Sequence, residues 1–207
     1  MSWFPNYQQK GDSEISNAAF LAAGRALHIC HLFESSCKWA LQVGEAVDFL
    51  DKNEGSNLKE AFESLKNKLL KQTIKSLDQF DDIDGNDINI LIEAADARNY
   101  IAHEATLFFG GDNKWLTIAR LKRLRQEVER LAKGANIAFL WSYEIENKEP
   151  GPRVIFQNYP QMVDDWIFAD LKNLLEEQEN HPDFLKAEKT LLEYDQTMNK
   201  RKKKAQI

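Results

Sequence analysis

The sequence predicts a mainly all-α protein, a bundle of long antiparallel helices. Proline-free stretches repeat apolar residues at helical spacing, as Leu58, Phe62, Leu65 and Leu69 do, and this period indicates helices. Residues that cap or stop helices, mainly aspartate, serine and glycine, separate these stretches. The chain has 207 residues, of which 43% are hydrophobic, so it is long enough to bury a core.

The first helix is expected over residues 14–51, with Asp12 and Ser13 as candidate caps and Gly24 or Gly44 as candidate bends. Its apolar residues surround much of the helix instead of following one face. We therefore expect this helix to be central in the bundle or shared with a partner. The residues concerned are Phe20, Leu27, Phe33, Trp39, Val43, Val47 and Leu50.

Two further helices are expected in the middle of the chain. The second begins at Ser56 and ends near Asp78, and its apolar stripe keeps helical spacing with lysines in between. An aspartate-rich turn at 81–87 then supplies a cap for a third helix over 88–109, which the glycines at 110–111 stop.

The fourth helix is expected over residues 114–133, with Gly134 as its C-cap. Beyond it, apolar residues alternate with a period of two, and a Pro-Gly-Pro loop follows. This pattern predicts a small β-hairpin over 137–157, although the fourth helix continuing through the same residues is the alternative. The alternating residues are Ile137, Phe139, Trp141, Tyr143 and Ile145.

Two C-terminal helices close the chain, over about 160–178 and 182–203, and each is expected to begin at a proline. The organisation that follows is a helical bundle over residues 1–134 and a C-terminal extension over 135–207. We expect the extension to pack on the same domain.

The charge pattern limits the surfaces that could contact nucleic acid. The net charge is −6, so the whole molecule repels polyanions and RNA would need a local basic surface. On the helix 114–133, Arg123 stands four residues before Glu127 and is expected to pair with it. Arg120 and Lys122 lack such partners, so they are the better candidates for binding an RNA backbone.

The ends of the chain and its cysteines bear on localisation. The first ten residues lack the features of a secretory signal, and no apolar run approaches a membrane span, so a cytoplasmic protein without membrane contact is expected.

Cys30 and Cys37 are too far apart on one helix for a disulfide. The basic run 200–204 is either a solvated tail or a polyanion contact.

The stretch EAADARNYIAHE at residues 93–104 concentrates chemistry within the third helix. Asp96, Asn99 and His103 stand one helical turn apart, so they form a polar ridge. Arg98 flanks this ridge and is surrounded by alanines. Small residues around a long cation allow a second helix to approach closely.

Residues 98–103, Arg-Asn-Tyr-Ile-Ala-His, resemble the signature of HEPN domains, in which an arginine and a polar residue precede a histidine by a few positions. HEPN domains are all-α bundles that include many metal-independent ribonucleases of toxin, antiviral and RNA-surveillance systems. The resemblance covers about residues 14–133. It implies catalytic roles for Arg98 and His103, a supporting role for Asn99, and a homodimer in which both copies of the motif meet in a cleft.

A second pair, Arg25 and His31, also satisfies the loose form of this signature. We prefer Arg98 because a polar residue follows it and because its alanine-lined helix comes after a turn in mid-domain. Ala26 follows Arg25, within an apolar helix. His28 and His31 could begin a metal site, but no further ligands at recognisable spacing accompany them, so neither a metal nor a cofactor is expected.

The chemistry of RNA cleavage suits these residues without a metal. The 2′-OH of RNA is the nucleophile, an imidazole can accept or donate the proton, and a guanidinium can stabilise the charge on phosphorus. The resemblance therefore predicts an endoribonuclease that yields a 2′,3′-cyclic phosphate, as a toxin or phage-defence effector with an antitoxin or regulatory partner. The alternative is a non-catalytic helical module that binds a partner protein or a nucleotide.

Overall fold

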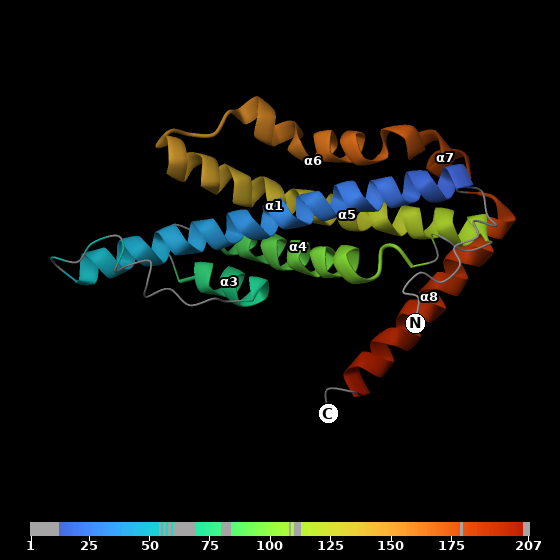
Figure 1. Ribbon diagram of the computed structural model, residues 1–207, viewed down its shortest axis with the longest axis horizontal. Helices are drawn as coiled ribbons and strands as arrows, with labels where there is room; N and C mark the ends of the chain where they lie inside the picture. Colours follow the sequence, from blue (N-terminus) through green and yellow to red (C-terminus); the bar gives the residue numbers. More distant parts are fainter. Residues whose placement is uncertain are drawn as a thin grey trace, which may run out of the picture.

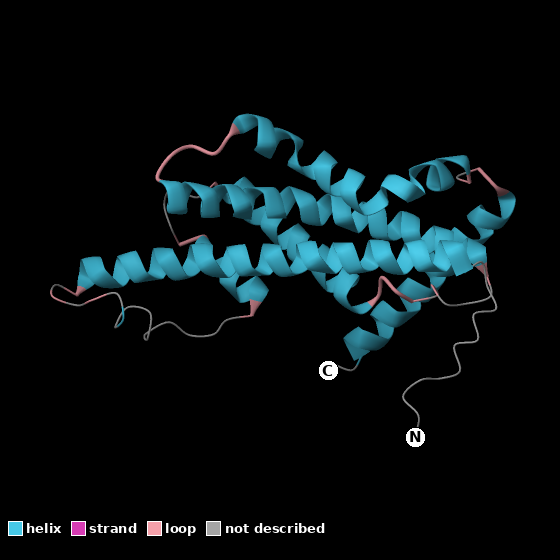
Figure 2. Ribbon diagram, turned by 45° about the horizontal axis from the view of Figure 1, so that its top comes forward, coloured by secondary structure: helices cyan, strands magenta, loops and turns pink. Residues whose placement is uncertain are grey.

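We describe the protein from a computed structural model. It describes residues 13–53, 69–79, 84–107, 113–178 and 180–204, together with positions 55, 57, 59 and 109. Throughout these residues the regular elements are helices, and none is a strand (Figure 2). The prediction of a mainly all-α fold is confirmed.

The helices form an elongated bundle in which α1 and α5 run along most of its length (Figure 1). In the order of the chain, the elements are α1 (Ser13–Lys52), α3 (Leu70–Leu77), α4 (Gly85–His103), α5 (Lys114–Asn147), α6 (Arg153–Phe168), the 3-10 turn η1 (Ala169–Leu171), α7 (Lys172–Glu177) and α8 (Pro182–Lys204). None of the described helices is both long and apolar enough to cross a lipid bilayer.

Helix α5 is the centre of the bundle, because α1, α4, α6 and α8 all pack against it. One cluster of buried side chains extends through all these helices, from Ala19 in α1 to Leu191 in α8. A helix covered on several sides needs apolar residues around much of its circumference. This explains why both α1 and α5 carry apolar residues on more than one face.

Local signals in the sequence set the start of α4. The side chain of Asp84, in the predicted aspartate-rich turn, accepts a hydrogen bond from the backbone N–H of Asn86 at 2.8 Å, which satisfies a free donor of the first turn. The helix ends at His103, earlier than the predicted position 109. The predicted caps of α1, most of the second predicted helix before Leu69 and the glycines at 110–111 lie outside the described residues or side chains.

The predicted β-hairpin over 137–157 is wrong, because α5 continues to Asn147 and α6 begins at Arg153. The alternation that suggested a strand consists of two stripes with i, i+4 spacing on different sides of α5. Trp141 and Ile145 line a hollow together with residues of α1. The rings of Phe139 and Tyr143 instead contact Tyr159 and Phe156 of α6, with ring centroids 5.3 and 6.1 Å apart.

The predicted C-cap at Gly134 is also wrong, because Gly134 lies inside α5 and is buried. A Cβ atom added at this position would collide with the Cβ atom of Ala94 in α4. The glycine therefore allows α4 and α5 to approach each other closely. No break in the backbone helix separates the proposed bundle 1–134 from the extension 135–207.

The C-terminal helices differ from the prediction in one place. Pro160 lies inside α6 and does not begin a helix, since α6 starts at Arg153, just after the Pro-Gly-Pro loop. Pro182 does begin α8, as predicted. Helix α8 packs against α5 and then extends obliquely from one end of the bundle (Figure 1). Its helical backbone continues to Lys204 and so includes the basic run 200–204. The side chains of this run are not described.

We expect Gly134→Ala to lower the free energy of unfolding by about 1–3 kcal/mol, because the new methyl group would overpack the contact between α4 and α5. Gly24→Ala in α1 is the matched control, since a Cβ atom there would meet nothing within 4 Å. That change should stabilise the protein by roughly 0.5–1 kcal/mol. Urea denaturation checks both values, and equal effects of the two changes would contradict the close approach.

Candidate functional site

Helix α4 separates the residues of the motif onto different sides. Ala94, Ala95 and Ala97 are fully buried against the bundle. Arg98 is half-buried and reaches toward α1, whereas Asn99 and His103 are exposed. The alanine-rich face therefore holds the helix in place, and the polar residues lie along the edges of that face.

Arg98 is held by an ion pair between α4 and α1. Its Nη2 atom donates to Oε2 of Glu34 at 2.6 Å, and its Nη1 atom donates to Oδ1 of Asn99 at 3.2 Å. Its side chain is 28% exposed, and its buried Nε atom donates no hydrogen bond to a described residue. Asp96, the first residue of the polar ridge, lies 2.5 Å from Lys71 of α3.

Glu34 is a site residue that the sequence analysis missed. It accepts a hydrogen bond from Lys38 at 2.8 Å in addition to the bond from Arg98. The hydrogen bond from Lys38 lowers the pKa of Glu34, partial burial opposes this effect, and the charge of Arg98 lowers the pKa further. Glu34 is 64 residues away from Arg98 in the chain, so no local spacing could have linked the two.

Asn99 and His103 line a cleft of about 600 Å³ between α4, α5 and α8. The opposite wall is formed by Arg123, Glu127 and Arg130 of α5, and Asp195 of α8 lies at one end. The other lining residues are Asp96, Tyr100 and Glu104. The structure thus brings Asn99 and His103 together in one cleft, while Arg98 lies beside the cleft and is connected to it through Asn99.

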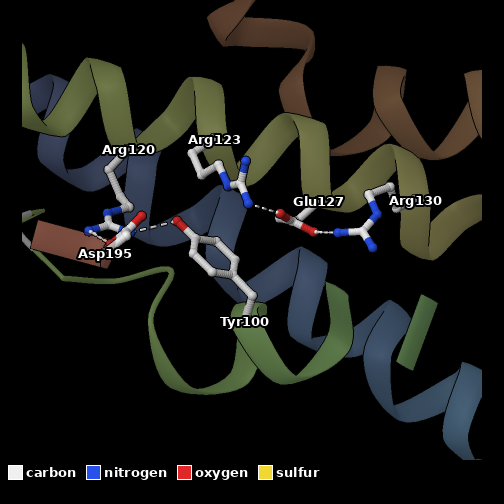
Figure 3. Close-up of polar contacts among 6 residues, drawn as sticks. All are labelled: Tyr100, Arg120, Arg123, Glu127, Arg130 and Asp195. Carbon is white, nitrogen blue, oxygen red and sulfur yellow. Dashed lines mark hydrogen bonds and ion pairs between the residues drawn. The ribbon is translucent and has the colours of Figure 1, made fainter. Parts of the chain in front are cut away.

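The wall on α5 carries a row of three charged side chains (Figure 3). Glu127 is only 2% exposed, and its two carboxylate oxygens bind different cations. Oε1 lies 2.6 Å from Nη2 of Arg123, and Oε2 accepts a hydrogen bond from Nη1 of Arg130 at 2.8 Å. The predicted pairing of Arg123 with Glu127 is confirmed. One turn further along, Lys133 pairs with Glu129 at 2.8 Å.

The prediction that Arg120 is available to bind RNA is wrong, because Arg120 is fully buried. Its Nη1 atom donates to the hydroxyl of Tyr100 at 2.7 Å, and its Nη2 atom lies 3.4 Å from Oδ1 of Asp195 in α8 (Figure 3). Burial raises the pKa of Tyr100, which keeps the phenol neutral, while the hydrogen bond from Arg120 opposes the shift. Arg120 therefore joins α4, α5 and α8.

Lys122 also has a partner that local spacing did not reveal. Its Nζ atom lies 3.3 Å from Oε1 of Glu188 and 5.2 Å from the centre of the Phe184 ring, both in α8. Since its side chain is 27% exposed, Lys122 serves mainly to hold α8 on α5. The expectation that it lacks a partner is wrong.

The second arginine of the loose motif, Arg25, has a structural contact of its own. Its Nη1 atom donates to the backbone carbonyl of Trp166 in α6 at 2.8 Å, and its guanidinium lies 5.7 Å from the centre of the Trp166 indole. Arg25 thus attaches α6 to α1. Within the described part of the chain, no three His, Cys, Asp or Glu side chains gather closely enough to hold a metal ion.

We expect Tyr100→Phe to lower the free energy of unfolding by about 1–3 kcal/mol, because it removes the nearer of two acceptors of a buried guanidinium donor. Tyr143→Phe is the matched control, since the hydroxyl of Tyr143 bonds Glu149 at the surface. The control should change stability little. Thermal denaturation of both variants checks the difference, and a neutral Tyr100→Phe would contradict a structural role for this hydrogen bond.

We expect Glu34→Gln to destabilise the protein at neutral pH, because Arg98 and Lys38 lose the charge of their partner. The pKa of Glu34 is lowered in the folded state, so its stabilising effect is present above the unfolded pKa and is lost as pH falls through the folded pKa. Urea midpoints of the two proteins should therefore converge in acid.

The control for this pH series is Asp48→Asn, which breaks the exposed pair between Asp48 and Lys52 on the same helix. Exposed pairs contribute little, so this variant should follow the unsubstituted protein at every pH. A difference between Glu34→Gln and the unsubstituted protein that stays constant into acid would show that the carboxylate charge is not responsible.

The site therefore consists of Asn99 and His103 in a cleft, Arg98 fixed beside it by Glu34, and a row of alternating charges on the facing helix. The HEPN resemblance rests on residues 98–103 and on the order of the helices. In comparisons with protein-family models, curated proteins and solved structures, no match to this chain was found.

Proposed function

We propose that the protein is a metal-independent endoribonuclease of the HEPN kind. The observation that supports this proposal is the arrangement of the motif around the cleft. His103 and Asn99 face the same space, and Asn99 accepts a hydrogen bond from Arg98 at 3.2 Å. The histidine and the amide thus face a cleft of about 600 Å³, which is where we place the RNA strand, and the guanidinium of Arg98 is linked to this cleft through Asn99.

In the proposed reaction, the 2′-oxygen of a ribose attacks the adjacent phosphorus, and the bond from phosphorus to the 5′-oxygen breaks. His103 exchanges protons with the reacting oxygens, because an imidazole can act as both base and acid near neutral pH. Arg98 offers guanidinium N–H groups to the phosphate oxygens as charge develops. The products are a 2′,3′-cyclic phosphate and a 5′-hydroxyl.

The proposal includes a homodimer, in which a second copy brings another Arg98 and His103 to the reacting phosphate. Exposed apolar side chains on α1 support such pairing, among them Leu21, Leu27 and Leu32. Within this proposal, the protein acts in the cytoplasm as a toxin or phage-defence effector, with an antitoxin or other regulatory partner.

A second candidate function is a helical module that binds a partner protein or a nucleotide without catalysis. The observation that favours it is the ion pair between Arg98 and Glu34 at 2.6 Å. This pair directs the guanidinium toward α1, whereas His103 lines the cleft on the other side of α4. If Arg98 serves only to join two helices, then the arginine of the motif takes no part in a reaction at His103.

Cleavage of RNA in the presence of EDTA separates the two functions. We expect the unsubstituted protein to cut single-stranded RNA, and Arg98→Ala or His103→Ala to lower the rate by at least about 100-fold, since each removes a group that acts on the reacting phosphate. The measurement is gel analysis of the products, with detection of terminal 2′,3′-cyclic phosphates.

The matched control is His31→Ala, which removes an exposed histidine of the second motif match on α1. Purified in parallel, this variant should cut RNA like the unsubstituted protein, and circular dichroism should report equal helicity for all variants. Cleavage that persists in both Arg98→Ala and His103→Ala would rule out the ribonuclease. Absence of cleavage by the unsubstituted protein would favour the binding module.

A further inference from the structure

We propose that Arg123 and Arg130 form a clamp for the phosphate groups of single-stranded RNA on the α5 wall of the cleft, positioned by Glu127. The inference deepens the proposed function, because it assigns the residues that hold the RNA backbone opposite Asn99 and His103. In this proposal, RNA contacts Arg123 and Arg130 and not Arg120 and Lys122, because the last two residues pair with carboxylates of α8.

The spacing of the three residues directs both arginines into the cleft. Arg123, Glu127 and Arg130 follow one another at i, i+4 and i+7, so they occupy one face of α5. All three line the same cleft as Asn99 and His103. Figure 3 shows the carboxylate of Glu127 lying between the two guanidinium groups.

The arginines retain donors for a ligand although each is paired. Arg123 contacts Glu127 through Nη2, and Arg130 does so through Nη1. A guanidinium has five N–H donors in a planar fork, so each side chain has further donors. Their side chains are 49% and 38% exposed, whereas Glu127 is 2% exposed. The anion is hidden and the two cations remain accessible.

The charges of Arg123, Glu127 and Arg130 on the α5 wall favour a ligand group that carries a single negative charge. Two cations share one buried carboxylate, so one positive charge remains uncompensated. The other carboxylates that line the cleft are engaged as well, since Asp96 pairs with Lys71, Asp195 pairs with Arg120, and Glu104 is not without a partner. A phosphodiester carries one negative charge. A duplex presents more negative charge per length than a single strand, so a protein whose net charge is −6 repels a duplex more strongly.

Tyr100 adds a constraint on the orientation of Arg123. The guanidinium carbon of Arg123 lies 5.6 Å from the centre of the Tyr100 ring, within the range of a cation–π interaction. The hydroxyl of Tyr100 is in turn fixed by Arg120. Arg123 is therefore held from two sides before a ligand arrives, which reduces the entropy lost on binding.

The test measures binding without cleavage. Fluorescence anisotropy follows a labelled, short 2′-O-methyl RNA, which lacks the nucleophile and cannot be cut by the proposed reaction. We expect Arg123→Gln and Arg130→Gln each to weaken binding by roughly five- to tenfold, because each removes a charged contact to phosphate. The slope of log K against log salt should become shallower by about 0.7 for each lost contact.

Three further variants make the test specific. Lys133→Gln is the matched control, because Lys133 belongs to α5 and pairs with a glutamate one turn away, but it does not line the cleft. It should bind RNA like the unsubstituted protein. The double change R123Q/R130Q leaves the buried carboxylate of Glu127 without its partners, which could disturb the fold. The triple change R123Q/E127Q/R130Q removes this carboxylate as well, so no uncompensated charge remains at this position. Both variants should lose binding of RNA.

The outcomes separate the clamp from the ribonuclease. If the unsubstituted protein binds the RNA in an arginine-dependent way but cuts no RNA, the clamp stands and the ribonuclease does not. If the protein cuts RNA while the triple variant binds with unchanged affinity and salt slope, the clamp is overturned and the ribonuclease stands. No binding by the unsubstituted protein, or an equal loss of binding in Lys133→Gln, would also overturn the clamp.

Discussion

The close contact between α4 and α5 is the constraint on which the rest of the structure depends. Gly134 allows the two backbones to approach where Ala94 lies against it, and the neighbouring Ala95 and Ala97 of α4 are also fully buried. Small residues at a helix contact fix the distance between the axes within narrow limits. That distance sets the width of the cleft, because its two long walls are the neighbouring edges of the same helices.

Two buried charges on α5, Arg120 and Glu127, hold the groups around the cleft in place. Arg120 pairs with Asp195 of α8, whereas Glu127 pairs with Arg123 and Arg130 of its own helix. Removing one partner of a buried pair is costly, because the remaining charge stays desolvated. Helix α8 is therefore attached through specific charges in addition to the apolar contacts of Phe184 and Leu191. Its position along α5 follows from Asp195 meeting Arg120.

Much of the helical fold could be predicted from local signals, whereas the long-range contacts could not. Periodicity and the aspartate-rich turn at 81–87 predicted α1, α4 and the start of α5, and i, i+4 spacing predicted the pair of Arg123 with Glu127. The pairs Arg98 with Glu34, Arg120 with Asp195 and Arg125 with Asp164 join residues 64, 75 and 39 positions apart. Spacing along the chain carries no information about such pairs. The false hairpin has a related cause, because alternation also arises when a helix is covered on two sides.

The uninterrupted length of α5 has a mechanical consequence. Its 34 residues span about 51 Å at 1.5 Å per residue, with no proline within the helix to act as a hinge. The apolar hollow near Trp141 and the charged wall of the cleft are therefore attached to one stiff rod. A force that tilts one end must displace the other, and the two ends of the molecule cannot rearrange independently while this helix remains intact.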